Sequence, residues 1–267
     1  MTSLLRNVIA KLPFGMKQPL ARAKRWLNYR LLVLSGGPGK QFPSPVHCPL
    51  CRHDFTFFIP ISGSEDAIGL CPNCASHGRH RLIWPYLQQQ TQLFTKPHKL
   101  LHVSPEYCFY ERLRNCPTIT YLAGDKFEEG HSYPSDTVAI DLTSLHFSND
   151  YFDALLCLHV LEHIPAEQQA LREMHRVLKP GGWAIIQVPM DHSRATTFED
   201  DAITDPQERE KIFGQWDHVR VYGNDYQQRL EKAGFKVKRE DYRKLFSPEQ
   251  IERYGMVKED IYLCLKN

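Results

Sequence analysis

Residues 151–188 have the sequence YFDALLCLHVLEHIPAEQQALREMHRVLKPGGWAIIQV. The nearly continuous apolar run 152–158 has the length of one strand, and such runs are typical of strands buried on both faces. Residues 166–178 then place apolar side chains at helical spacing, and Pro180-Gly-Gly182 ends that helix. Residues 183–188 form a second apolar run. This strand–helix–strand unit predicts a parallel sheet with helices packed on it.

The same alternation continues on both sides of this unit. Further strands are expected at 99–103, 118–122, 137–140, 235–238 and 261–265, and helices at 82–93, 110–115, 226–233 and from 247. Strands that alternate with helices in this way predict an α/β domain with a parallel sheet and helices on both faces.

Two Cys-x-x-Cys knuckles precede this domain. Cys48-Pro-Leu-Cys51 and Cys71-Pro-Asn-Cys74 are separated by nineteen residues. Four thiolates at this spacing can close a tetrahedral shell around one Zn²⁺, and a closed shell leaves no position for a catalytic water. The knuckles therefore predict a small zinc-ribbon module with a structural metal, in a protein kept in a reducing compartment. The basic run 77–81 follows directly and could meet an anionic acceptor.

Charge is unevenly distributed along the chain. Residues 1–53 hold nine Lys or Arg and no Asp or Glu, whereas the rest has 24 basic and 31 acidic residues. A basic arm suggests attraction to phosphate or to an anionic surface. The stretch 20–34 mixes basic and apolar side chains, so it predicts a helix that lies either on a membrane interface or on the protein's own body.

No stretch has the ~20 apolar residues of a membrane span, and the arm lacks a signal-peptide pattern. We expect a cytoplasmic protein, with membrane contact through the arm left open. Three parts are predicted: a basic arm at 1–44, the zinc module at 45–80 and the α/β domain at 81–267.

The segment 151–188 resembles the class I S-adenosylmethionine-dependent methyltransferases. The Phe-Asp start, the Leu-Glu-His after the strand and the Arg-Val-Leu-Lys-Pro-Gly-Gly turn match the central segment of that family. The resemblance extends over about residues 99–267. It implies a Rossmann-like seven-stranded sheet that binds S-adenosylmethionine over the carboxyl ends of its first strands, which agrees with the general rule for open α/β sheets.

Carried over one at a time, the family's cofactor residues fall at the ends of successive strands. The resemblance implies that Asp125 holds the ribose hydroxyls, that Asp141 and Leu142 contact the adenine, and that His159 lies where cofactor and acceptor meet. The alternative for Asp125 and Asp141 is a structural role, as turn residues that follow strands.

The first loop departs from the family pattern. Where the family usually has an acid-x-Gly-x-Gly loop, this chain has residues 102–107 without a glycine. Pro105 and Glu106 are expected to contact the cofactor there, with Glu106 on its amino group. A bacterial subset of the family shares both this loop and the preceding cysteine module, together with the pattern seen here at 197–200 and 214–223.

That downstream segment concentrates ionisable side chains between two helices. Closely spaced polar side chains are costly to bury unless they form hydrogen bonds or ion pairs, or take part in binding or catalysis. An Asp217–His218 or Glu199–His218 pair could remove a proton from an acceptor hydroxyl, because His titrates near working pH, and His159 and His163 are rival bases. Glu199, Arg220 and Tyr222 are the predicted substrate contacts. The alternative is a salt-bridged loop that braces the sheet edge.

Three functions follow from these patterns. The first is methyl transfer to a small-molecule or glycan-type acceptor, by O- or N-methylation, with a structural zinc. The second is an RNA methyltransferase or RNA-binding module that uses the zinc ribbon and the basic arm. The third is a degenerate, non-catalytic scaffold, which the glycine-free loop suggests. We also expect the zinc module to form a wall or lid of the acceptor site.

Overall fold

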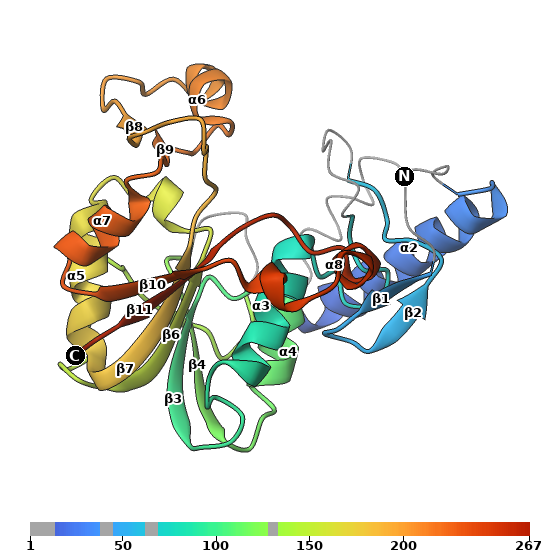
Figure 1. Cartoon of the computed structure of the whole chain (residues 1–267), viewed down its shortest axis with the longest axis horizontal. Helices are drawn as coiled ribbons and strands as arrows, with labels where there is room; N and C mark the ends of the chain where they lie inside the picture. The colour runs from blue at the N-terminus through green and yellow to red at the C-terminus, as the bar shows by residue number, and fades with distance from the viewer. Residues whose placement is uncertain (1–13, 38–44, 62–68, 128–132) are drawn as a thin grey trace.

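The computed structural model describes residues 14–37, 45–61, 69–127 and 133–267. Its main body is a seven-stranded sheet in the order β10-β11-β7-β6-β3-β4-β5 (Figure 1). The strands are β3 (His98–Val103), β4 (Ile119–Asp125), β5 (Val138–Ala139), β6 (Phe152–Leu158), β7 (Leu178–Gln187), β10 (Lys236–Glu240) and β11 (Ile261–Leu265). The predicted Rossmann-like seven-stranded sheet is therefore confirmed.

Strand direction differs from the expectation in one respect. β3 to β7 run parallel, but β11 is antiparallel to both β7 and β10. The sheet is mixed, not wholly parallel. The expectation was wrong here because the apolar pattern of residues 261–265 reports burial and says nothing of the direction in which a strand runs.

The order of the strands creates a switch point between β3 and β6. From β3 the chain moves outward through β4 to β5 on one side, whereas β6 and β7 lie on the other side. The loops that follow β3 and β6 therefore separate at the carboxyl edge of the sheet, which is where open α/β sheets bind ligands.

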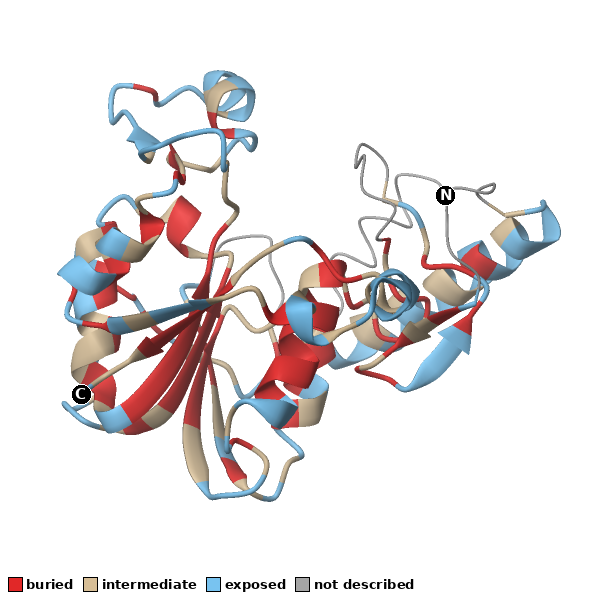
Figure 2. Cartoon of the chain, in the orientation of Figure 1, coloured by how far each residue is buried: buried red, intermediate tan, exposed pale blue. Residues whose placement is uncertain are grey.

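Helices cover both faces of the sheet (Figure 1). They are α3 (Gly78–Gln89), α4 (Tyr107–Leu113), α5 (Glu167–Val177) and α7 (Tyr226–Lys232), whereas α8 (Pro248–Tyr254) contacts β1 (Val46–Cys48) of the cysteine module. Alternate residues of β6 serve two cores: Leu156 packs in the core that includes α3 and α4, and Cys157 in the core that includes α5 and α7. Figure 2 shows the central strands buried along their length, as expected of a sheet covered on both sides.

The segment between β7 and α7 forms a separate polar excursion. It contains β8 (Phe198–Glu199), α6 (Pro206–Phe213) and β9 (Arg220–Val221), and β8 pairs with β9. Asp205 caps α6 by accepting hydrogen bonds from Gln207 N and Glu208 N, with Pro206 at the first helical position. In Figure 1 this excursion lies at the opposite side of the chain from β1 and β2.

Within the described part of the arm, residues 14–37, the chain forms a helix, α2 (Phe14–Leu34). Pro19 lies within α2, close to its N-terminal end, and its missing N–H removes one backbone hydrogen bond of the helix. Tyr29 is buried against Phe55 and Phe57, and its hydroxyl accepts a hydrogen bond from Thr56 N at 2.9 Å. One face of α2 thus packs on the protein's own body. Within the described residues, no helix combines the length and apolarity that a membrane crossing requires.

Arg81 joins the cysteine module to the carboxyl-terminal part of the chain. Its side chain is fully buried over the ring of Phe58 and donates to the carbonyl oxygens of Ser76, Gly69, Tyr254 and Gly255. The run 77–81 therefore does not present Arg81 to an anionic acceptor, because the guanidinium is used inside the protein. The boundary predicted at 80/81 falls within α3.

Candidate active site and metal centres

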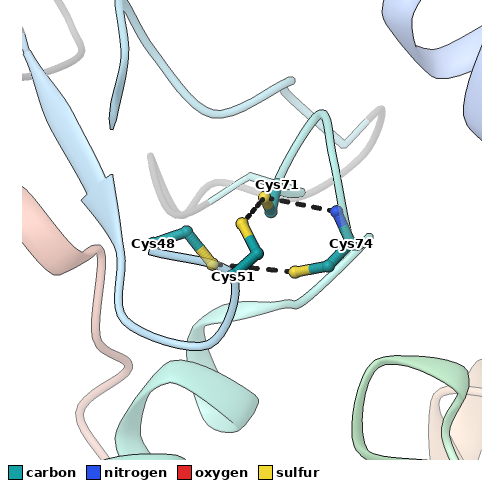
Figure 3. Close-up of side chains that lie close together, drawn as sticks. All are labelled: Cys48, Cys51, Cys71 and Cys74. Atoms are coloured by element: carbon teal, nitrogen blue, oxygen red, sulfur yellow. Dashed lines mark hydrogen bonds between the residues drawn. The ribbon is translucent and has the colours of Figure 1, made fainter. Parts of the chain in front are cut away.

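The four knuckle cysteines converge on one point (Figure 3). The Sγ atoms of Cys48 and Cys74 are 3.6 Å apart, and those of Cys51 and Cys71 are 3.5 Å apart. A disulfide would bring two sulfurs to about 2.05 Å, whereas tetrahedral Zn–S bonds of about 2.3 Å space sulfurs by roughly 3.8 Å. All four cysteines are free thiols. This four-cysteine cluster therefore has the spacing and chemistry of a closed metal shell.

The carboxyl ends of β3, β4 and β6 bring the predicted cofactor residues to one edge. Val103 is level with both Gly124 and Cys157, so the chain beyond it stands beside Asp125 on one neighbour and Leu158 on the other. Adjacent strands are about 4.8 Å apart. The loop after β3, the carboxylate after β4 and His159 after β6 thus surround the switch point.

Two residues at this edge adopt the left-handed backbone conformation. Ser104 has φ of 45° and His159 has φ of 55°, although neither is glycine. Such backbone is costly for side chains with a Cβ and often marks functional turns. The Ser104 turn is held by a hydrogen bond from its N–H to Gly124 O at 2.8 Å. The glycine-free loop therefore makes its tight turn at Ser104, directly before Pro105.

Glu106 lies between two imidazoles. Its carboxylate accepts hydrogen bonds from His102 Nε2 at 3.1 Å and from His80 Nε2 at 3.3 Å. Burial alone would raise the pKa of Glu106, but these two hydrogen bonds outweigh it and hold the pKa well below its usual range. Glu106 is therefore ionised at neutral pH, and His80 ties the loop after β3 to the end of the cysteine module.

The neighbouring cofactor candidates differ in exposure. Asp125 is half-buried, and its carboxylate accepts from Phe127 N at 3.3 Å. Asp141 is exposed and accepts from both N and Oγ1 of Thr143, which lowers its pKa. The side chain of Leu142 is buried in the core. Asp141 thus stabilises its own turn, as the structural alternative expects. Contact of these residues with a cofactor stays a prediction.

Buried His80 makes stability depend on pH. Burial lowers its pKa more than the hydrogen bond to Glu106 raises it, so the unfolded chain binds the extra proton below about pH 6.5. Stability should therefore fall as pH drops, by up to about 1.4 kcal/mol at pH 5.5 for this one group. Denaturant unfolding of the zinc-loaded protein and of His80→Gln at about pH 7.5 and pH 5.5 should show the smaller loss in the variant. Equal losses in the two proteins would contradict this assignment.

A second group of ionisable side chains lies just beyond β6. We call Glu162, His163, Asp217 and His218 the histidine–carboxylate cluster. His163 Nδ1 is 3.1 Å from Asp217 Oδ2, and the rings of His163 and His218 meet edge to face with centroids 4.7 Å apart. The structure thus brings together the three predicted catalytic residues, which the sequence separates by more than fifty positions. The predicted Asp217–His218 pair is instead an Asp217–His163 pair.

The cluster is held in place from β9. Arg220 is 3% exposed and donates to the carbonyl oxygens of Leu161, Ile164 and Pro165 at 2.6–2.9 Å. Its Nε donates to Glu199 Oε2 at 2.8 Å. These bonds fix the turn that carries Glu162 and His163. The structure favours the bracing role for Arg220 over the predicted substrate contact, because its guanidinium is buried and fully engaged, whereas Glu199 pairs with it from an exposed position.

Tyr222, the third predicted substrate contact, is also inaccessible. It is fully buried and packs edge to face on Tyr226, which in turn contacts Tyr262 of β11. Burial raises the pKa of the Tyr222 hydroxyl well above its ordinary value. Tyr222 therefore belongs to the core under the excursion, and a substrate could not reach it in this conformation.

Removing the Arg220 brace should be costly. Arg220→Met leaves three carbonyl oxygens around a buried position without their donor, while Glu199 keeps Arg229, and we expect a loss of about 3 kcal/mol of unfolding free energy. The matched control is Arg194→Met, since Arg194 forms an exposed pair with Asp191 and should cost less than about 1 kcal/mol. Denaturant titration measures both. Similar losses for the two variants would contradict the bracing role.

Glu162, His80 and His102 were not among the predicted site residues. Glu162 and His102 are almost completely buried, and each contacts a predicted site residue: Glu162 approaches His159 and His102 bonds Glu106. A signal was present for Glu162, because a carboxylate that follows a buried strand within four residues, next to Leu161, has to be partnered or functional if it is buried. His80 and His102 carried no comparable signal, since their partner lies on a separate element.

The comparisons with known proteins agree with this architecture. Residues 115–186 match the family described as "Methyltransferase domain". The matched segment begins before β4 and ends within β7, so it includes Asp125, Asp141, His159 and two residues of the cluster. A comparison with curated proteins gives no match.

Several solved structures are similar in outline. The [4+2]-cyclase SpnF is 16% identical, with a TM-score of 0.48, over 92% of this chain and 95% of its own. An S-adenosylmethionine-dependent methyltransferase from Mesorhizobium loti is 16% identical, with a TM-score of 0.44, over 68% of this chain and 96% of its own. The 1,6-didemethyltoxoflavin-N1-methyltransferase of Burkholderia thailandensis is 14% identical, with a TM-score of 0.42, over 68% and 76%.

None of these likenesses assigns an acceptor to this chain. The family match and the strand topology concern overlapping parts of the molecule, because the matched residues supply β4, β5, β6 and most of β7, whereas β3 precedes them. Over residues 115–186, which lie within the seven-stranded sheet, the chain is similar to the family described as "Methyltransferase domain".

Proposed function

We propose that the protein transfers a methyl group from S-adenosylmethionine to a hydroxyl or amine of a small-molecule or glycan-type acceptor. The observation that carries the proposal is the position of the histidine–carboxylate cluster. It follows β6 within four residues of His159, at the same edge of the sheet as Asp125 and the loop after β3. The cofactor would supply an electrophilic methyl on a sulfonium.

The chain's own task is then positioning and proton removal. Asp125, Glu106 and His159 would hold the cofactor at the switch point. Asp217 Oδ2 lies 3.1 Å from His163 Nδ1, so the carboxylate would favour the tautomer that leaves Nε2 as the basic atom. Burial lowers the pKa of His218, so this second imidazole is neutral at working pH. Two imidazoles beside a carboxylate suit an acceptor whose proton must leave.

Calorimetry with S-adenosylhomocysteine tests the cofactor part. Wild-type, zinc-loaded protein should bind, and Asp125→Asn should bind at least tenfold more weakly if that carboxylate accepts from both ribose hydroxyls. The control is Asp201→Asn, an exposed residue of the excursion. Absence of binding by folded wild-type protein would support the scaffold alternative.

The acceptor class is tested with methyl-labelled S-adenosylmethionine and a fractionated cell extract. Label should enter the small-molecule or glycan fraction. Label in RNA, with binding that weakens steeply as salt rises, would support the RNA alternative instead. Each outcome selects one of the three functions that the sequence left open.

We also propose that the Cys48, Cys51, Cys71 and Cys74 cluster holds a structural Zn²⁺. Four thiolates fill a tetrahedral shell and leave no position for a reacting water. Reduced cysteines suit the cytoplasm. The module lies beside α3 and apart from the excursion in Figure 1, so it would act on the cofactor loop through His80 and Glu106 and not as a wall around His218.

A second feature favours contact of α2 with an anionic membrane surface. Its outward face carries an apolar stripe at helical spacing, formed by Met16, Leu20, Leu27, Leu31 and Leu34, which are between 48% and 81% exposed. The helix contains five Lys or Arg and no acidic residue. Such a face suits anionic lipid, to which each basic residue near the surface adds about 1 kcal/mol, whereas a second copy of this helix would bring like charges together.

Flotation with vesicles tests this contact. Full-length protein should float with vesicles that contain phosphatidylserine and not with neutral ones, and Leu27→Glu should reduce the bound fraction several-fold. The control is Leu245→Glu, at a residue that is 66% exposed on another part of the chain. Equal binding by the two variants would remove the proposal, as would wild-type protein that dimerises through α2 without binding vesicles.

A further inference from the structure

Three members of the histidine–carboxylate cluster are arranged as metal ligands. One ligand atom from each of Glu162, His163 and His218 lies within 4.8 Å of the other two. Glu162 and His163 come from the 3-10 turn η1 (Leu161–His163) that follows β6, and His218 comes from the segment that leads into β9. Two elements distant in sequence therefore supply a compact set of two imidazoles and one carboxylate.

Each imidazole already has one nitrogen engaged. His163 Nδ1 is 3.1 Å from Asp217 Oδ2, and His218 Nδ1 is 3.2 Å from Phe213 O. Both neighbours are oxygen atoms, so the tautomer with its hydrogen on Nδ1 suits each ring and keeps a lone pair on Nε2. Histidine ligands of metals commonly donate their other N–H to a carboxylate or a backbone carbonyl, which fixes the tautomer and the ring orientation.

The carboxylate is poorly satisfied by the protein. Glu162 is 1% exposed, and within the described residues its Oε2 has no hydrogen-bond partner. Its Oε1 is 3.5 Å from His159 Nδ1, which is too long for a strong hydrogen bond. A buried carboxylate oxygen without a partner is costly, and buried charges in proteins are normally paired or bound to a metal. The buried carboxylate of Glu162 therefore has the environment expected of a group that binds a cation.

We infer that Glu162, His163 and His218 bind a divalent transition-metal ion, through one carboxylate oxygen and the two Nε2 atoms. Two imidazoles and a carboxylate are a ligand set that zinc, iron and similar ions take in catalytic sites, with at least one position left open. The four-cysteine cluster, by contrast, is closed. The chain would then carry two metal sites of different kinds, one structural and one open.

The role of this ion rests on the proposed function. At the open position the ion would bind the acceptor hydroxyl and lower its pKa, so that the proton passes to solvent water. The acceptor oxygen then forms its bond to the methyl carbon while the C–S bond breaks and its electron pair stays on sulfur. In this form of the reaction His163 and His218 would be metal ligands and not bases. The ion, in their place, would make the acceptor oxygen nucleophilic.

Metal content tests the site without reference to activity. Full-length protein equilibrated with Zn²⁺ or Co²⁺ and freed of excess ion should hold two ions per chain by elemental analysis. Glu162→Gln and His218→Ala should each hold one, with the ion of the four-cysteine cluster retained. The control is His146→Ala, at an exposed histidine outside the histidine–carboxylate cluster, which should hold two. Circular dichroism and thermal unfolding confirm that each variant is folded.

Cobalt spectra distinguish the two ions. Thiolate charge-transfer bands of the four-cysteine cluster should persist in Glu162→Gln, while the weaker bands of the nitrogen and oxygen site should disappear. One ion per chain in folded wild-type protein would overturn the inference. If such protein still bound S-adenosylhomocysteine and transferred label, the proposed function would stand without the second ion. If the protein bound two ions but transferred no labelled methyl, the metal site would be supported and the proposed function would be contradicted.

Discussion

Replacing Cys48 with serine should unfold the cysteine module and cost the chain more stability than removal of the Arg220 brace. The module's own sheet consists of two three-residue strands, β1 (Val46–Cys48) and β2 (His53–Phe55). Such a segment buries too little apolar surface to fold by itself. Structural zinc contributes on the order of 10 kcal/mol to comparable modules, so loss of one thiolate removes much of that term.

Zinc content and thermal unfolding measure this effect. Cys48→Ser should lose the ion of the four-cysteine cluster and unfold in two steps or at a markedly lower temperature. The control is Cys116→Ser, because Cys116 lies outside the cluster and serine can keep its contact with Thr118 Oγ1. A variant that keeps its zinc and its melting temperature would show that the cluster does not hold a structural metal.

The effect should extend beyond the module. Arg81 follows the second knuckle and donates to carbonyl oxygens near both Ser76 and Gly255, and Asp54 of β2 pairs with Arg253 of α8. These contacts connect the module to α8 and to the core behind α3. Disorder of the module should therefore expose α3 to proteolysis, whereas the core that includes α5 and α7 stays protected.

Much of the fold could be predicted from the sequence because it depends on local pattern. The apolar runs 152–158 and 183–188 specify buried strands in whatever context they occur, and the knuckle spacing brings four thiolates together through short loops. The direction of β11 could not be predicted in this way, since its five residues would bury equally well in either direction. Pro19 also lies inside α2, where a helix that packs Tyr29 on Phe55 tolerates one lost backbone bond.

The residues of the candidate site were easier to predict from the sequence than the contacts between them. His163, Asp217 and His218 are recognisable as ionisable residues in a costly place, yet their pairing depends on how the excursion folds back on β6. Arg220 shows the same limit, because a charged residue in a polar segment suggests a substrate contact until three carbonyl oxygens are found around its guanidinium. Long-range contacts of this kind are not encoded in local spacing.

His163→Ala should have the largest effect on catalysis. His163 is partly exposed, lies beside the predicted cofactor edge and is the member of the histidine–carboxylate cluster that both His218 and Asp217 contact. Whether its Nε2 accepts the acceptor's proton or binds an ion that lowers the acceptor's pKa, its loss should reduce kcat by about 10² to 10⁴. Because the residue is placed on the acceptor side, affinity for S-adenosylhomocysteine should change little.

Asp217→Asn separates chemistry from positioning. Asn keeps the size of the side chain and can still accept from His163 Nδ1, but it removes the charge that orients the ring and increases its basicity. We expect a loss of about 10- to 100-fold, smaller than that of His163→Ala, together with a shift in the pH profile of kcat. The measurement is transfer of labelled methyl to the acceptor fraction under saturating cofactor, with His146→Ala as the unaffected control. Undiminished transfer by His163→Ala would place the acceptor elsewhere along the sheet edge, nearer His159 and the glycine-free loop.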